Sequence, residues 1–135
     1  VGPRQAGWAS HARVPLAALR DAPLLLPGDD FALTRRVREA TVGQGFEARI
    51  AAQSGQWDFL VAMAAAGLGT TLIPAPLLAR LNLGDELAVR PLAEPRLDWH
   101  VALIWKPGGY MSRAARAWLA VCEESLPTGP WSAAA

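Results

Sequence analysis

The sequence predicts an α/β layered domain with a mostly parallel sheet and helices on both of its faces. Segments with strand patterns alternate along the 135 residues with segments of helical periodicity. The stretch AMAAAGLGTTLIPAP, residues 62–76, joins an apolar helix to a β-branched strand through two closely spaced glycines. The composition, 52% hydrophobic and 19% charged, is typical of a globular chain long enough to bury a core.

The first third of the chain predicts one strand and one amphipathic helix. Residues 1–13 lack an apolar period and are expected to be an entering segment, and a short element follows that ends near Arg20. An apolar strand is expected at 23–26, closed by a turn at 27–30. Asp29 and Asp30 are predicted N-caps of a helix over 31–42, which Gly43 and Gly45 end. Its inner stripe is expected to hold three apolar side chains: Leu33, Val37 and Ala40.

The middle third predicts a strand, a buried helix and a second strand in close succession. Residues 46–53 alternate as a strand does, with the side chains of residues 48, 50 and 52 expected to point inward. Ser54 is expected to cap the next helix, which is apolar on both sides and is therefore predicted to be buried on both sides, with Leu68 on its inner face. Gly67 is the predicted left-handed stop, and Gly69 permits a second tight turn. Residues 70–73 are then expected to form an interior strand that ends at a proline.

The last third predicts two further strands and a terminal helix. A short helix is expected at 75–81, with strands at 87–92 and 99–105. Ser112 is the expected cap of the last helix. Apolar side chains recur on that helix at helical spacing: Ala115, Trp118, Leu119, Cys122 and Leu126. Residues 127–135 are expected to be an unstructured tail.

Composition and motifs exclude several classes of function. The net charge of +1 gives no global field for nucleic acid or acidic membranes, and no apolar run is long enough to span a bilayer. The single Cys122 favours a reducing compartment. His11 and His100 share no motif with it, so neither a metal site nor a cofactor is expected. No nucleophile-and-base set is visible, so no catalytic residue is assigned and an enzyme is not expected.

Three segments, taken in order, resemble the effector-binding domain of LysR-type bacterial transcriptional regulators. They are VPLAALRDAPLLLP, GFEARIAAQSGQWDFLVAMAAAGLGTTLIPAPLL and LAVRPLAEPRLDWHVALIWKPGGYMSRAARAWL. The resemblance covers residues 13–126, and its most specific parts are AAGLGTTLIP, VRPL and SRAARAWL in that order.

The resemblance implies a type-2 periplasmic-binding-protein-like fold, in which two α/β subdomains enclose a small-molecule cleft. On this interpretation residues 14–104 form most of the second subdomain, and residues 105–126 are the returning segment and C-terminal helix of the first. Nothing in the sequence resembles the family's helix-turn-helix, and the opening third of the effector domain also has no counterpart. We therefore expect a cytoplasmic fragment of a regulator that binds a small-molecule effector, associates with copies of itself and contacts DNA only through a domain that this sequence lacks.

The expected effector contacts lie in loops and helix N-termini beside the cleft, where exposed N–H groups attract carboxylates. The first choice is the run Gln53, Ser54, Gly55 and Gln56, in which Ser54 either caps its helix or donates to the ligand. Gly69 and Thr70 resemble the family's cleft-facing turn, whereas Thr71 is expected to pack within its strand. Trp105 has two interpretations, stacking on an effector or packing in the core.

Two other classes of function stay open at this point. A solute-binding protein of a transport system shares the fold, although the sequence shows no export signal. An α/β enzyme of unknown reaction is the second alternative. An upstream helix-turn-helix would favour the regulator, and an upstream signal peptide would favour the transport protein.

Overall fold

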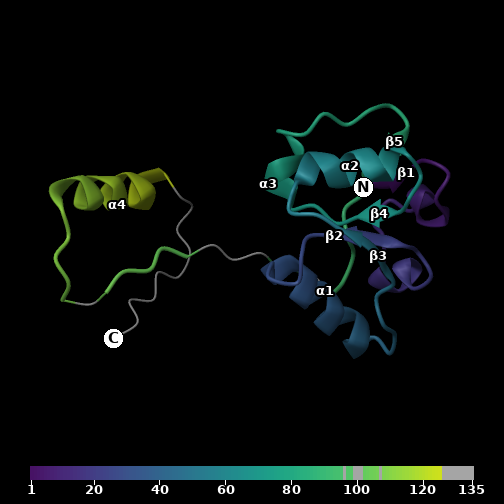
Figure 1. The fold of residues 1–135 in the computed structure, drawn as a ribbon, viewed down its shortest axis with the longest axis horizontal. Coiled ribbons are helices and arrows are strands. Elements are labelled where there is room, and N and C mark those ends of the chain that lie inside the picture. The colour runs from purple at the N-terminus through teal and green to yellow at the C-terminus, as the bar shows by residue number, and fades with distance from the viewer. Residues whose placement is uncertain (96, 99–101, 107, 126–135) are drawn as a thin grey trace. The chain divides into compact units, whose positions relative to one another are not determined.

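The structure is a computed structural model that describes residues 1–95, 97–98, 102–106 and 108–125. The chain divides into two units, residues 1–99 and residues 100–135 (Figure 1). Each unit is described by itself.

The first unit is built on a three-stranded parallel sheet with strand order β3-β2-β4. The central strand β2 (Leu24–Leu26) pairs with β3 (Ile50–Gln53) on one side and with β4 (Thr70–Thr71) on the other. These strands confirm the predictions near 23–26, 48–53 and 70–73. The inward alternation predicted for residues 48, 50 and 52 is also confirmed, because they are half-buried while the residues between them are exposed.

The N-terminal residues, predicted only as an entering segment, pair with segments from distant parts of the chain. The Val1 nitrogen donates to the Thr71 carbonyl at 2.8 Å, and the Thr71 nitrogen donates back to the Val1 carbonyl at 2.8 Å. Burial lowers the pKa of this amino group to about 6. Beyond Val1, β1 (Gly2–Pro3) pairs antiparallel with β5 (Leu87–Ala88). The sequence could not reveal β1, because a two-residue strand carries no period and its partner lies far away along the chain.

Helices cover both faces of the sheet (Figure 1), and the three leucines of β2 supply both cores. Leu24 and Leu26 face α1 (Ala32–Gly43), the 3-10 helix η2 (Leu16–Leu19) and Trp8 of the 3-10 helix η1 (Gly7–Ser10). Leu25 faces α2 (Trp57–Ala65) and packs with three of its residues: Leu60, Val61 and Ala64. All three leucines are 0% exposed, and each such burial contributes about 1.5–3 kcal/mol. The predicted α/β class is confirmed.

Helix α2 is buried on one side only, so the prediction of burial on both sides is wrong. Phe59 is 52% exposed, and Leu68, which was assigned to the inner face, is 57% exposed. Met63, predicted on the same side as Phe59, is half-buried against the core. The apolar pattern was misleading because the sheet covers one side of the helix and because α2 ends at Ala65, before Leu68.

The predicted aspartate caps of α1 are also wrong. The N-cap position is Phe31, and no side chain makes a capping hydrogen bond there. Thr34 Oγ1 instead donates to the Pro27 carbonyl at 2.8 Å, which ties the first turn of α1 to the end of β2. The side chain of Asp29 makes other contacts, described below.

The two glycines between α2 and β4 have different roles. Gly67 has φ +80° and ends α2, as predicted. Gly69 allows a close backbone approach, since a Cβ there would lie 2.4 Å from the Pro23 carbonyl oxygen. The next nitrogen, that of Thr70, donates to the same oxygen at 2.8 Å.

The remaining elements are shorter than predicted. The helix expected at 75–81 is α3 (Ala75–Leu78). The strand expected at 87–92 is β5 followed by a single bridge between Val14 and Leu92. Of the strand expected at 99–105, residues 102–105 are not in a strand and residues 99–101 lie outside the described residues. A strand needs a neighbouring edge, and the described residues of the second unit offer none.

The second unit contains one helix, α4 (Arg113–Ser125), among its described residues. Ser112 Oγ accepts from the Ala115 nitrogen at 3.1 Å, which confirms the predicted cap. Leu126 and the predicted tail at 127–135 lie outside the described residues.

We expect Gly69→Ala to lower the free energy of unfolding by about 3 kcal/mol, at the upper end of overpacking effects, because its methyl group would collide with the Pro23 carbonyl. Gly43→Ala is the control. A methyl group on Gly43 would meet no neighbouring atom within 4 Å, so we expect a gain of about 0.5–1 kcal/mol at this helical residue. Urea unfolding of both variants measures the difference, and equal stabilities would contradict the close approach.

Candidate functional site

The loops that follow β2 and β3 lie at one edge of the sheet, because the two strands are parallel. Ligands of open α/β sheets bind at this carboxyl edge. Gln53, the last residue of β3, reaches across to the β2 loop. Its Nε2 donates to the Pro27 carbonyl at 3.1 Å and to Asp29 Oδ1 at 2.9 Å. The structure therefore links the predicted run Gln53–Gln56 to the neighbouring loop.

The carboxylate of Asp29 accepts hydrogen bonds from two other elements at this edge. Its Oδ1 also accepts from Arg38 Nη2 of α1 at 3.1 Å. The hydrogen bond from Gln53 and the one from Arg38 lower the pKa of the Asp29 carboxyl below its usual value. The side chain of Asp29 is 69% exposed, so the two donors hold an ionised carboxylate that solvent reaches. An incoming anion would have to compete with Asp29 for these two donors.

Ser54 stabilises a turn before α2 and is not the cap of that helix. Its Oγ accepts from the Gln56 nitrogen at 3.2 Å, while the N-cap position is Gln56 and has no side-chain capping bond. The Ser54 nitrogen donates to the Leu26 carbonyl at 3.1 Å, which continues the β2–β3 pairing into the loop. A Cβ at Gly55 would touch the Phe31 ring at 3.8 Å, so the two loops pack closely.

Gly69 and Thr70 lie at the opposite edge of the sheet from Gln53–Gln56. In the parallel register Thr70 is beside Leu24, the first residue of β2. Thr70 is 4% exposed, and its Oγ1 accepts from Trp8 Nε1 at 2.9 Å. The structure therefore does not bring these two residues together with the first group. Trp105 belongs to the second unit, where its side chain is 53% exposed.

A groove of about 440 Å³ lies where β4 ends. Its lining includes Leu33 of α1, residues 72–75 after β4 and residues 89–92 after β5. Arg13, Arg90 and Asp98 are the charged residues that line it. The sequence could have predicted residues 72–75 as part of this groove. Ligands of open α/β sheets bind beyond the carboxyl ends of the strands, which selects the residues after β4 and not the turn before it.

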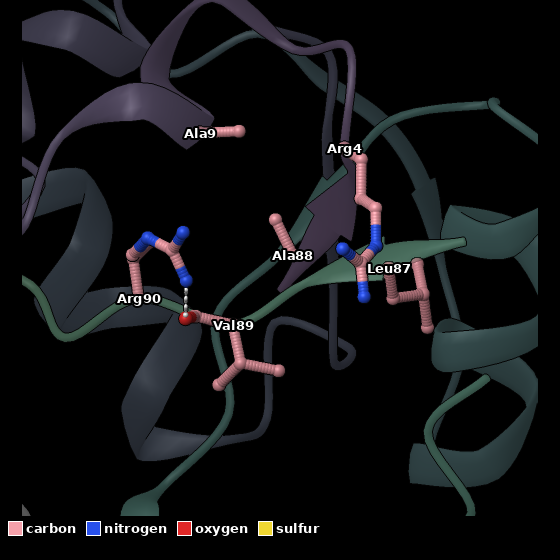
Figure 2. A pocket seen from close by; sticks show the side chains of 6 residues that line it. All are labelled: Arg4, Ala9, Leu87, Ala88, Val89 and Arg90. Atoms are coloured by element: carbon pink, nitrogen blue, oxygen red, sulfur yellow. Dashed lines mark hydrogen bonds between the residues drawn. The ribbon is translucent and has the colours of Figure 1, made fainter. Parts of the chain in front are cut away.

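A second hollow of about 380 Å³ lies over β5 (Figure 2). Ala9 and Ala88 are small, buried lining residues, and the side chains of Arg4 and Arg90 lie on either side of Ala88. Each guanidinium donates to a backbone carbonyl, Arg4 to Asp85 and Arg90 to Val89 at 2.8 Å. Val89 and Arg90 line both this hollow and the larger groove.

The described residues contain no cluster of three or more His, Cys, Asp or Glu side chains able to hold a metal ion. In the part of the chain that the structure describes, no helix is both long and apolar enough to cross a membrane.

A family model described as the LysR substrate binding domain matches residues 1–127. The chain belongs to this family. This match confirms the resemblance found in the sequence.

Individual relatives agree with the family match. The chain is 36% identical over 111 residues to YwbI of Bacillus subtilis (strain 168), an uncharacterized HTH-type transcriptional regulator, covering 82% of the chain and 36% of that protein. It matches the crystal structure of HinK, a LysR family regulator from Pseudomonas aeruginosa, with a TM-score of 0.65 at 22% identity, covering 92% of the chain and 43% of HinK. A putative LysR regulator from the same species gives a TM-score of 0.64 over 42% of its length. The chain thus spans less than half the length of each of these relatives. The structural matches confirm the predicted periplasmic-binding-protein-like fold.

We expect opposite effects from the same substitution at two adjacent buried threonines. Thr71 Oγ1 is buried and has no hydrogen-bond partner within the described structure, so Thr71→Val should raise the free energy of unfolding by about 1 kcal/mol. Thr70→Val removes the acceptor of Trp8 Nε1 and should lower it by about 1–3 kcal/mol. Chemical denaturation of both variants tests the contrast, and destabilisation by Thr71→Val would show that its hydroxyl has a partner.

Asp29→Ala should lower the thermal midpoint at pH 7, because it removes the acceptor of Gln53 and Arg38. A lowered folded pKa means that the carboxylate stabilises the fold above its unfolded pKa of about 3.9 and loses this effect as the pH falls through the folded pKa. The gap between parent and variant should therefore close below about pH 4.

Asp30→Ala is the matched control, since no hydrogen bond of the Asp30 carboxylate is found in the described structure. A gap for Asp29→Ala that stays constant from pH 7 to pH 3 would contradict the role assigned to its charge.

Proposed function

We propose that the chain is the effector-sensing part of a LysR-type transcriptional regulator and that a small molecule binds at the carboxyl edge of its sheet. The observation that carries the proposal is the apolar groove after β4, which lies where parallel α/β sheets bind ligands. Family membership supports a sensing role, because the matching family model is named for substrate binding.

The proposed ligand is a small organic acid with an apolar body. Leucine, isoleucine and valine side chains of the groove suit such a body, and the guanidinium groups of Arg13 and Arg90 suit its carboxylate. Gln53, Ser54, Gly55 and Gln56 are proposed as polar contacts at the neighbouring loops. Trp105 stays a prediction from the sequence, as an aromatic residue that stacks on an effector. Gly69 and Thr70 are proposed to act indirectly, by holding β4 in the register that positions Leu72–Ala75.

The proposal includes how the domain would act within a longer regulator. DNA contact would come from a separate helix-turn-helix domain, in keeping with the HTH-type name of the Bacillus relative. The chain itself would be a bacterial cytoplasmic sensor that binds without catalysis and associates with copies of itself. The net charge of +1 suits this division, since it gives little general attraction to DNA.

Thermal melts against a panel of small carboxylic acids, each paired with its neutral amide, test the proposal. At a hundredfold excess over its Kd, a true effector should stabilise the fold by about 2.7 kcal/mol. Arg13→Ala should weaken binding of the acid about tenfold, the scale of one charge-assisted contact, and leave binding of the amide unchanged.

Arg35→Ala is the control with the same change in net charge, since Arg35 is exposed on α1 and does not line the groove. A panel in which no acid shifts the melt, or equal losses in both variants, would contradict the proposed site.

A further inference from the structure

The hollow over β5 is lined by two arginines from distant parts of the first unit (Figure 2). The antiparallel pairing of β1 with β5 brings Arg4 to this place, and the Arg4 nitrogen donates to the Glu86 carbonyl at 3.1 Å. Arg90 lies two residues beyond the end of β5, and its side chain is on the same side of this segment as that of Ala88 (Figure 2). The fold thus places two cationic side chains on either side of one small residue.

Hydrogen bonds to the backbone orient both guanidinium groups. Arg4 Nε donates to the Asp85 carbonyl, and the two Nη atoms of Arg4 make no hydrogen bond within the described structure. Arg90 Nη1 donates to the Val89 carbonyl at 2.8 Å, which leaves Nε and Nη2 as a fork for a bidentate contact. Neither arginine forms a salt bridge with a described residue. An anion would therefore meet donors that are already positioned, and less of its affinity would be lost in ordering them.

The rest of the lining does not compete for these donors. Four apolar residues complete it: Ala9, Leu87, Ala88 and Val89. None of the described residues that line the hollow is acidic, and the neighbouring Glu86 lines a different pocket, beside α2. Arg4 and Arg90 are exposed, so an anion can reach both from solvent.

Two guanidinium groups around one spot favour a phosphoryl group over a carboxylate. A carboxylate carries one charge on two oxygens, which a single guanidinium satisfies through two parallel hydrogen bonds. A phosphate monoester carries a charge of about −1.5 to −2 at pH 7 and three acceptor oxygens, so it can accept from two guanidinium groups at once. The volume of about 380 Å³ is at the small end of ligand pockets, which suits a small molecule.

We propose that the hollow over β5 binds the phosphoryl group of a small molecule between the guanidinium groups of Arg4 and Arg90. The proposal does not depend on the effector proposed for the groove after β4. Arg90 lines both places, whereas Arg4 lines the hollow and Arg13 lines the groove. Variants of Arg4 and Arg13 therefore distinguish the two sites.

Isothermal titration and thermal melts of the 135-residue chain in phosphate-free buffer, at constant ionic strength, test the proposal. The probes are inorganic phosphate and glycerol 3-phosphate, and at least one of them should bind saturably and raise the thermal midpoint. Acetate, which has a single charge and no apolar body, should do neither at the same concentrations. Tighter binding of the ester would identify a phosphorylated metabolite as the ligand, and equal or weaker binding would identify free phosphate.

Arg4→Ala and Arg90→Ala should each raise the Kd of the bound probe at least tenfold, the scale of one lost charge-assisted contact. Arg4→Lys keeps the charge and loses the planar fork, so it should weaken binding by a smaller factor. Arg35→Ala is the control with the same change in net charge as Arg4→Ala, since Arg35 does not line the hollow, and it should bind the probe like the parent. Melts without added probe show whether each variant is folded.

Three outcomes would overturn the proposal. The first is that neither probe binds saturably, and the second is that acetate binds as tightly as phosphate. The third is equal weakening by Arg4→Ala and Arg35→Ala, which would indicate general attraction to positive charge. Loss of binding in Arg13→Ala with no loss in Arg4→Ala would also contradict it, because the phosphate would then occupy the groove. If Arg4→Ala does not fold, Arg4→Lys and Arg90→Ala decide the question.

Discussion

The close approach of the Gly69 backbone to the Pro23 carbonyl is the contact on which the first unit depends. It brings the Thr70 nitrogen to 2.8 Å from that oxygen and so places Thr70 beside Leu24. This register directs the Thr70 hydroxyl to Trp8 on one face and places Thr71 beside Leu25, which faces α2. It also determines where β4 ends, and hence where Leu72–Ala75 form a wall of the groove. The absence of a side chain at Gly69 thus links the packing of the sheet to the geometry of the proposed site.

The carboxyl edge of the sheet combines an apolar groove with two polar loops, those after β2 and β3. In these loops the charge of Asp29 is already paired with that of Arg38. Asp29 accepts from Gln53 and Arg38, so the donors closest to the loops are engaged with a carboxylate of the chain itself. Arg13 and Arg90 line the groove and form no ion pair within the described structure. A carboxylate in the groove would therefore meet two guanidinium groups beside one carboxylate, that of Asp98, whereas at the loops it would have to displace Asp29. This difference is the physical reason for placing the acid group of the proposed ligand beside the arginines.

The two units differ in how much apolar surface they bury. The first buries its leucine-rich strand β2 between helices on both faces of the sheet. The second contributes one capped helix in which no residue is fully buried. Such a helix gains most of its stability from packing against a partner, because a helix of 13 residues is marginal in water by itself.

The sequence by itself determined the α/β class, the three parallel strands, the end of α2 at Gly67 and the Ser112 cap, because each depends on local period or turn chemistry. It also predicted the loop after β3 as part of a site, through the family resemblance and the general position of ligand loops.

Only the tertiary structure decided the rest. The pairing of Val1 with Thr71 and of β1 with β5 joins distant segments that carry no local signal. The contacts of Asp29 replaced the predicted cap because Gln53 and Arg38 approach it from other elements. The side of α2 that carries Phe59 stays exposed because the sheet covers only the opposite side of that helix. The positions of Gly69 and Thr70, at the edge opposite Gln53, followed from strand direction and register, which depend on long-range pairing.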